Sequence, residues 1–178
     1  EIEGKVSELL DKVNENGRKD ELIDKLGLKN VLDREMTQLS GGELQRVAIA
    51  ATMLRKANFY FFDEPASFLD ITARIKVARL IREMVDDSTA VLVVEHDLAT
   101  LDYISDQLQI LYGEAAVYGI VTQIKPVRRG INEYLDGFLP DDNVRFRDYK
   151  ITFNRGVERG VKRPELFSWP DLEKNFDS

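Results

Sequence analysis

Apolar residues recur every three or four positions through the first third of the chain, residues 1–57. This period places them on one side of an amphipathic helix. We therefore expect a helical subdomain, with helices over 5–13 and 19–27, a short helix or turn over 29–34, and a longer helix from Ser40. The residues of the longer helix that are expected to face the core are Leu44, Val47, Ala48, Ala51 and Leu54.

Short, continuous apolar runs alternate with helical patterns through residues 58–124. Runs of this length predict strands that are buried on both faces of a sheet. The alternation of strands with helices predicts an α/β fold with a mostly parallel sheet. Strands are expected over 58–62, 90–94, 107–112 and 117–123, and helices over 71–85 and 98–105.

The pattern weakens after residue 124. A short helix is predicted over 130–138 and an exposed strand over 144–154, whereas 155–178 contain charges and prolines without a clear period. We interpret residues 125–154 as a hinge-like region and residues 155–178 as a linker towards a following domain.

The charge is unevenly distributed along the chain. The formal net charge is −7, but residues 125–163 contain ten Lys and Arg against six Asp and Glu. A basic stretch in an acidic protein indicates a polyanionic partner. A solvated surface is the simpler interpretation of the same residues.

Composition excludes several classes of site. The chain has no cysteine and a single histidine, His96, which excludes disulfides, iron–sulfur or thiolate ligands and a multi-histidine metal centre within it. No apolar run reaches the roughly 18 residues of a membrane-spanning helix, and nothing at the start reads as a signal peptide. We therefore expect a cytoplasmic protein without a membrane partner. Because the chain begins at Glu1 inside a helical pattern, we expect a fragment or a cropped domain.

A serine and a glutamate enclose two glycines at the start of the longer helix. Ser40 and Glu43 have the spacing of a capping box, in which each side chain satisfies a free backbone amide. The box does not account for Gly41 and Gly42, because glycine weakens a helix and usually permits close backbone approach. Bare amides at a helix N-terminus can bind an anion. The segment is therefore either a helix start alone or one half of a phosphate site.

Two carboxylates follow the first predicted strand. Asp63 and Glu64 come at the carboxyl end of 58–62, where parallel sheets bind ligands. One carboxylate can hold Mg²⁺, directly or through water. The next can orient or deprotonate a water beside a γ-phosphate. A strand-end turn, terminated by Pro65, is the alternative interpretation.

His96 comes directly after the second predicted strand, 90–94. It would lie on the same rim as Asp63 and Glu64 if the two strands are parallel neighbours. A neutral imidazole at that place can hydrogen-bond a phosphate oxygen or an attacking water. Asp70, before the helix over 71–85, is an N-cap candidate.

In this order and on these elements, the motifs resemble an ABC-type ATPase nucleotide-binding domain. LSGGE is similar to the ABC signature, FYFFDE to the Walker B strand, SFLD to the D-loop and His96 to the switch histidine. VVEHDLATLDYISD narrows the resemblance to subfamily E, the ribosome-recycling ATPases also called RNase L inhibitor. LYGEAAVYGIVTQ and GINEYLDGFLPDDNVRFRDYKITF do the same and lie outside the shared ABC core. One small departure is the stretch from Ala66 to Asp70, which reads ASFLD where the family often has SSYLD.

The resemblance implies a partial P-loop NTPase-type domain with ATP and Mg²⁺ as cofactors. Residues 1–57 would be the helical signature subdomain, and 58–124 the part of the core with Walker B, D-loop and switch histidine. Asp63 would hold Mg²⁺ through water, and Glu64 and His96 would be catalytic. The residues implied in nucleotide binding, at an interface with a second ATPase domain of the same polypeptide, are Ser40, Gly41, Gly42, Glu43 and Asp70.

The resemblance also implies partners outside this chain. The family has iron–sulfur clusters in an N-terminal domain, and it uses ATP binding and hydrolysis to split ribosomes into subunits. Some basic residues of the hinge-like region would then contact ribosomal RNA phosphates. Alternatively, Arg145 and Arg147 would pair with carboxylates between the two ATPase domains. The basic residues considered are Arg128, Arg129, Arg145, Arg147 and Lys150.

A Walker A string, G-x-x-x-x-G-K-[ST], does not occur among the 178 residues. We therefore expect that the chain by itself does not hydrolyse ATP. Two alternatives remain open. One is an ABC ATPase of a transporter or a DNA-repair machine, which residues 113–154 and the lack of coiled-coil heptads or zinc cysteines disfavour. The other is a truncated, non-catalytic interaction module that lends its signature to a partner.

Overall fold

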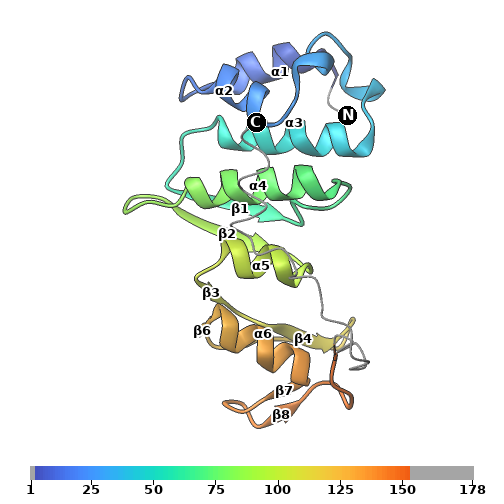
Figure 1. Ribbon diagram of the computed structural model, residues 1–178, viewed down its shortest axis with the longest axis vertical. Helices are drawn as coiled ribbons and strands as arrows, with labels where there is room; N and C mark the ends of the chain where they lie inside the picture. The colour runs from blue at the N-terminus through green and yellow to red at the C-terminus, as the bar shows by residue number, and fades with distance from the viewer. Residues whose placement is uncertain (1–2, 153–178) are drawn as a thin grey trace, which may run out of the picture.

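The structure, a computed structural model, describes residues 3–152. Its N-terminal part is the expected helical subdomain, which forms one end of the molecule (Figure 1). Helices α1 (Val6–Val13), α2 (Lys19–Lys25) and α3 (Gly41–Met53) are joined by the 3-10 turns η1 (Lys29–Val31) and η2 (Met36–Gln38). The predicted helices are thus confirmed, and η2 is an addition that the sequence pattern did not indicate.

The middle of the molecule contains two strands, each followed by a helix. These are β1 (Phe59–Asp63), α4 (Ile71–Glu83), β2 (Ala90–Val94) and α5 (Leu98–Ile104). The strands pair in parallel over their whole length, from Phe59 opposite Ala90 to Asp63 opposite Val94. The α/β class is confirmed, and the carboxyl ends of both strands lie at one edge of the sheet.

One face of this two-stranded sheet is uncovered within the described residues. Phe62 is buried, whereas Phe59, Phe61 and Leu92 are 58%, 51% and 48% exposed. Alternate residues of a strand point to opposite faces, so the exposed phenylalanines share the face away from the core. Within residues 3–152 the apolar runs are therefore buried on one face of the sheet only.

The buried side of α3 also differs from the expected stripe. Val47 and Leu54 are buried as expected, but Leu44 and Ala48 are exposed. The helix lies between the α1–α2 layer and the α4–β1 layer (Figure 1), so it buries a wider arc than a one-sided surface helix does. Its buried residues are Val47, Ile49, Ala50 and Met53.

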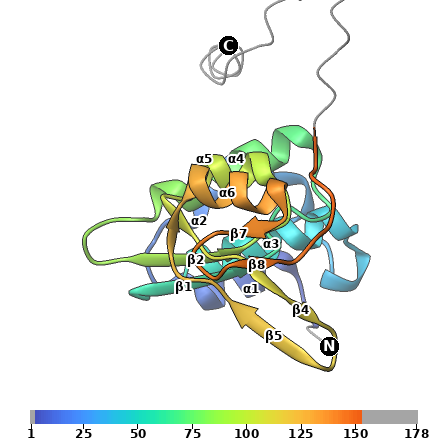
Figure 2. The same ribbon diagram turned by 90° about the horizontal axis from the view of Figure 1, so that it is seen from below.

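The strand expected over 107–112 does not extend the parallel sheet. It is divided into β3 (Gln107–Leu108) and β4 (Leu111–Glu114), which pair antiparallel with β6 (Lys125–Pro126) and β5 (Tyr118–Val121). A short turn joins β4 to β5, and closing such a hairpin costs less chain entropy than a long crossover connection. The hairpin projects away from the side lined by α4 and α5 (Figure 2).

The hinge-like region contains α6 (Val127–Asp136), β7 (Phe138–Leu139) and β8 (Val144–Arg145). Helix α6 begins earlier than expected, directly after Pro126, and ends at Gly137, whose φ of 68° suits glycine. The helix predicted over 130–138 is therefore present with shifted bounds. Among the described residues, no helix has the length and apolarity needed to cross a membrane.

Only two residues of the strand expected over 144–154 are paired as a strand. Beyond β8, the amides of Phe146 and Arg147 donate to the Gly137 carbonyl at 3.0 and 3.3 Å. The Arg147 guanidinium donates to the carbonyls of Tyr134 and Leu135. A cation at a helix C-terminus is favoured by the helix dipole, so the segment docks on the end of α6 instead of extending. The predicted linker, 155–178, lies outside the described residues.

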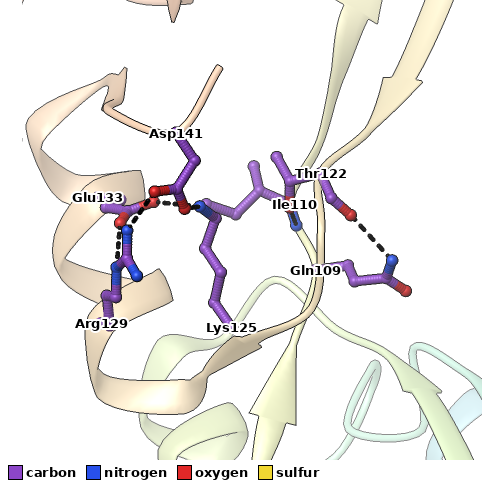
Figure 3. Close-up of polar contacts among 7 residues, drawn as sticks. All are labelled: Gln109, Ile110, Thr122, Lys125, Arg129, Glu133 and Asp141. Carbon is purple, nitrogen blue, oxygen red and sulfur yellow. Dashed lines mark hydrogen bonds and ion pairs between the residues drawn. The ribbon is translucent and has the colours of Figure 1, made fainter. Parts of the chain in front are cut away.

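A ring of four charged side chains ties α6 to the strands beside it (Figure 3). The Lys125 side chain, only 2% exposed, pairs with Glu133 at 3.0 Å and with Asp141. Arg129 closes the ring on the same two carboxylates, at 2.7 Å from Glu133 and 2.6 Å from Asp141. The carboxylates of Asp141 and Glu133 raise the pKa of Lys125 above its usual range. The ring therefore joins β6, α6 and the loop after β7 with balanced charge.

Replacing Lys125 with alanine should loosen the hinge-like region, because Glu133 would remain buried without its lysine partner. In the full-length protein we expect amide hydrogen exchange over residues 127–141 to become about 100-fold faster, which corresponds to the ~3 kcal/mol cost of breaking a buried pair. Lys150→Ala is the matched control, since Lys150 pairs with Asp136 at 3.0 Å but is 63% exposed. Exposed pairs contribute about 1 kcal/mol or less, and equal effects of both variants would contradict the prediction.

Candidate functional site

The capping box predicted at the start of α3 is present. The Ser40 hydroxyl accepts from the Glu43 amide at 3.4 Å, and the Glu43 carboxylate accepts from the Ser40 amide at 2.9 Å and from its hydroxyl at 2.7 Å. These hydrogen bonds from Ser40 hold the pKa of Glu43 below its usual range. Arg34 also contacts the Glu43 carboxylate at 3.3 Å. The N-terminus of α3 is thus fixed by its own first turn.

The two glycines of α3 allow another segment of the chain to approach closely. Phe68, in the turn before α4, has a φ of 62°, and its side chain is 80% exposed. Its ring lies beside Gly41, where a Cβ would meet ring carbon at 3.7 Å, an ordinary contact. A Cβ on Gly42 would meet the Phe68 carbonyl oxygen at 2.8 Å, which is too close. The signature-like segment and the D-loop-like segment therefore pack against each other within one chain.

The parallel strands bring Glu64 and His96 together. The Glu64 amide donates to the Val94 carbonyl at 2.8 Å, which continues the β1–β2 pairing past the end of the strands. The Glu64 carboxylate lies 3.1 Å from His96 Nε2 and accepts from the Ser67 hydroxyl at 3.0 Å. Glu64 has a φ of 46°, an uncommon backbone conformation that is concentrated at functional sites. The prediction that His96 and Glu64 share one rim is confirmed.

Asp63 ends β1 and is exposed at the same rim. Within residues 3–152, no group of three or more His, Asp or Glu side chains is arranged to hold a metal ion. Mg²⁺ commonly takes one or two protein carboxylates and completes its shell with water and phosphate oxygens. An exposed single carboxylate fits that donor set, and the metal role of Asp63 stays a prediction.

Asp70 caps α4 as predicted, since its carboxylate accepts from the Ala73 amide at 2.8 Å. The residue also ends the turn that begins at Glu64. Its predicted reach across an interface to a second domain stays a prediction.

Two further residues belong to this site but were not found from the sequence. The side-chain Nε2 of Gln45 donates to the backbone carbonyls of Glu64 and Pro65 at 3.3 and 3.4 Å, which ties α3 to the turn after β1. Glu95 is partly buried, and its Oε2 atom has no hydrogen-bond partner among the described residues. Burial, with the nearby charges of Asp97 and Glu64, raises the pKa of Glu95. The only sequence feature that could have indicated these two residues is their position next to predicted site residues. Gln45 follows Gly42 by three positions, and Glu95 directly precedes His96.

The basic residues of the hinge-like region divide into two groups. Arg129 and Lys150 pair with carboxylates of the same region. The Arg147 guanidinium lies between 5.2 and 5.6 Å from the rings of Tyr134, Phe146 and Tyr149. By contrast, Arg128 and Arg145 are exposed, and Arg145 lies 5.4 Å from the Phe138 ring.

Comparison with known proteins places these motifs in a family. A family model described as ABC transporter matches residues 3–67. An uncharacterised ABC transporter ATP-binding protein of Methanocaldococcus jannaschii is 55% identical over 176 residues, which cover 98% of this chain and 29% of that protein. The ABC transporter E family member 1 of Arabidopsis thaliana is 48% identical over 180 residues, covering 98% of this chain and 30% of that protein.

A solved structure shows the same fold at similar identity. It is the complex of the archaeal ribosomal stalk protein aP1 with the archaeal ribosome recycling factor aABCE1, with a TM-score of 0.84 and 56% identity. The match covers 93% of this chain and 31% of that chain. The chain belongs to subfamily E of the ABC ATPases. It spans about 30% of the length of these relatives.

The predicted motifs now have places in the fold. The signature-like segment begins α3, the strand that resembles Walker B is β1, and the predicted switch histidine follows β2. Gln45 and Phe68 link the signature helix to the turn that carries Glu64. Ser40 and Glu43 bond to each other, and Glu64 and His96 form a second group.

Gly42→Ala should displace the D-loop-like turn, because the added Cβ would lie 2.8 Å from the Phe68 carbonyl oxygen. We expect faster amide hydrogen exchange over residues 66–70 of the full-length protein. Gly41→Ala is the matched control, since its Cβ would make only an ordinary contact with the Phe68 ring at 3.7 Å. Helix propensity favours alanine over glycine at both positions by about 1 kcal/mol, so exchange that slows in both variants would refute the close approach.

Proposed function

We propose that this chain is part of an ABC ATPase that uses ATP binding and hydrolysis to split ribosomes into subunits. The observation that carries the proposal is the Glu64–His96 pair at the carboxyl ends of β1 and β2, 3.1 Å apart. Membership of subfamily E supports the link to translation, since a structural neighbour at 56% identity is a ribosome recycling factor. The protein would act in the cytoplasm, where ribosomes are found.

Glu64 would orient or deprotonate the water that attacks a γ-phosphate. The hydrogen bond from the Ser67 hydroxyl fixes one carboxylate oxygen, and His96 lies beside the other. His96 is 79% exposed, so its imidazole is free to contact a phosphate oxygen as well. Mg²⁺ bound at Asp63 through water would neutralise phosphate charge.

The signature segment would serve a different nucleotide from the one that Glu64 serves. In an ABC pair, Ser40, Gly41 and Gly42 would face the γ-phosphate of ATP held mainly by a second ATPase domain of the same polypeptide, with Glu43 keeping Ser40 in place. Amides at a helix N-terminus favour such an anion. Asp70, at the start of α4, would reach across the interface and couple the two sites.

The chain itself would be inactive, because no Walker A string occurs in its 178 residues. The P-loop that holds the β-phosphate would lie in another part of the full-length protein, as would the family's iron–sulfur clusters. We assign residues 1–57 to the signature subdomain, 58–124 to the ATPase core and 125–154 to the hinge. Residues 155–178 would lead towards the second ATPase domain.

Glu64→Gln in the full-length protein should slow ATP hydrolysis by at least about 100-fold, because glutamine cannot accept the proton of the attacking water. Unhydrolysed ATP should then stay trapped between the two closed ATPase domains. Turnover at saturating ATP and retention of labelled ATP measure the two effects. Glu83→Gln is the control, since Glu83 lies at the far end of α4 and pairs with Lys25 at 3.1 Å, away from the rim. Normal turnover in Glu64→Gln would contradict the assigned role.

The proposed contact with ribosomal RNA requires basic residues that are not already paired within the hinge-like region. Arg129, Arg147 and Lys150 are engaged within the hinge-like region. Arg128 and Arg145 are exposed, and within residues 3–152 neither forms an ion pair with a carboxylate. We assign the RNA contact to these two arginines.

Arg128→Glu and Arg145→Glu should weaken ribosome binding and reduce its dependence on salt concentration, because each phosphate contact releases about one counterion. Binding to ribosomal subunits over a series of salt concentrations measures the slope. Lys150→Glu controls for charge alone, since Lys150 is already paired with Asp136. An unchanged slope in both arginine variants would show that the basic residues do not contact RNA.

A further inference from the structure

Arg74, in the first turn of α4, contacts both loops that carry candidate catalytic residues. Its Nε donates to the Leu69 carbonyl at 3.0 Å, directly before Asp70. Its Nη1 lies 3.7 Å from Asp97 Oδ2, directly after His96. One guanidinium therefore joins the turn after β1 to the loop after β2.

The two loop residues that neighbour these contacts have fixed positions. Asp70 caps α4 through the Ala73 amide at 2.8 Å. Asp97 caps α5, accepting from the Ala99 amide at 3.0 Å and from the Thr100 hydroxyl at 2.9 Å. Each aspartate is hydrogen-bonded to the first turn of a helix. A displacement of either loop therefore also displaces the start of the helix that follows it.

Together these contacts form a closed circuit around Glu64. Its carboxylate contacts Ser67 in one loop and His96 in the other. From Ser67 the chain runs to Leu69, and from His96 to Asp97. Arg74 connects those two ends. Without Arg74, side-chain contact between the loops would depend on the exposed Glu64–His96 pair and on Glu95, whose carboxylate lies beside the Ala66 amide.

We propose that Arg74 is a positioning residue that couples the D-loop to the switch-histidine loop. The inference rests on the proposed ATPase function and assigns Arg74 no contact with nucleotide. When a partner domain displaces Leu69 and Asp70, the guanidinium transmits the displacement to Asp97 and so to His96. A guanidinium suits this role because its planar fork presents several donors in fixed directions, whereas a lysine ammonium is a single point charge.

Arg82 provides a matched control on the same helix. Its side chain is 42% exposed, as is that of Arg74, and it pairs with Asp106 through two hydrogen bonds of 2.7 and 2.8 Å. That pair lies at the other end of α4, away from both loops. Loss of Arg82 therefore removes a stronger ion pair without opening the circuit.

The experiment compares the full-length protein with its Arg74→Ala, Arg74→Lys and Arg82→Ala variants. Amide hydrogen exchange without nucleotide is followed over residues 64–70 and 95–101, and kcat and KM for ATP are measured in parallel. We expect Arg74→Ala to speed exchange in both segments and to lower kcat about tenfold to 100-fold, the range for a misplaced catalytic group. KM should change by less than about threefold, because no nucleotide contact is lost. Arg74→Lys should recover part of kcat, and Arg82→Ala should change neither measurement.

Three outcomes would overturn the inference: faster exchange in only one of the two segments, an unchanged kcat in Arg74→Ala, or an equal loss of kcat in Arg82→Ala. The exchange measurement does not depend on hydrolysis. If the wild-type protein shows no ATPase activity, the proposed function fails. The coupling is still refuted if Arg74→Ala speeds amide exchange in only one of the two segments or in neither. Coupled exchange in both segments would then support the Arg74 link alone.

Discussion

The candidate site depends on the parallel pairing of β1 with β2. This register sets Asp63 opposite Val94 and lets the Glu64 amide bond the Val94 carbonyl at 2.8 Å. The residue one position beyond β1 and the residue two positions beyond β2 then lie at one rim, which is how Glu64 and His96 come within 3.1 Å. Because strand side chains alternate between faces, a slip of one residue would turn Phe62 out of the core and separate the pair.

The helix starts around this rim combine structural and chemical roles. Ser40, Asp70 and Asp97 cap α3, α4 and α5, and each lies in or beside a proposed nucleotide motif. Capping therefore fixes the backbone at the places where the proposed chemistry requires precisely positioned side chains. Each cap also stabilises the folded protein by about 1 kcal/mol. Gln45 and Phe68 then join α3 to the turn after β1. A shift of the N-terminal part of α3 would therefore also shift the turn that carries Glu64.

The hinge-like region uses most of its basic residues for its own structure. Lys125 and Arg129 share Glu133 and Asp141 in a ring, and Arg147 is held by carbonyls at the end of α6 and by three aromatic rings. A local excess of positive charge is thus an unreliable guide to free cationic surface. Basic residues that are already paired within the region have to be set aside before a polyanion-binding surface is proposed. The two exposed arginines that remain are Arg128 and Arg145.

The sequence by itself determined the local elements and the chemistry. The helical period, the apolar runs and the capping residues predicted α1 to α5, β1 and β2, because these signals act over one or two turns or a single strand. The motifs also placed Glu64 and His96 at strand ends. Only the tertiary structure decided which strands pair, why Gly42 must lack a side chain, and that Arg74 spans two loops. Those features depend on contacts between segments far apart in the chain, and neither periodicity nor spacing records such contacts. For the same reason the strands expected over 107–112 and 144–154 are only partly present. The first is divided between two antiparallel pairs, and most of the second docks on the end of α6.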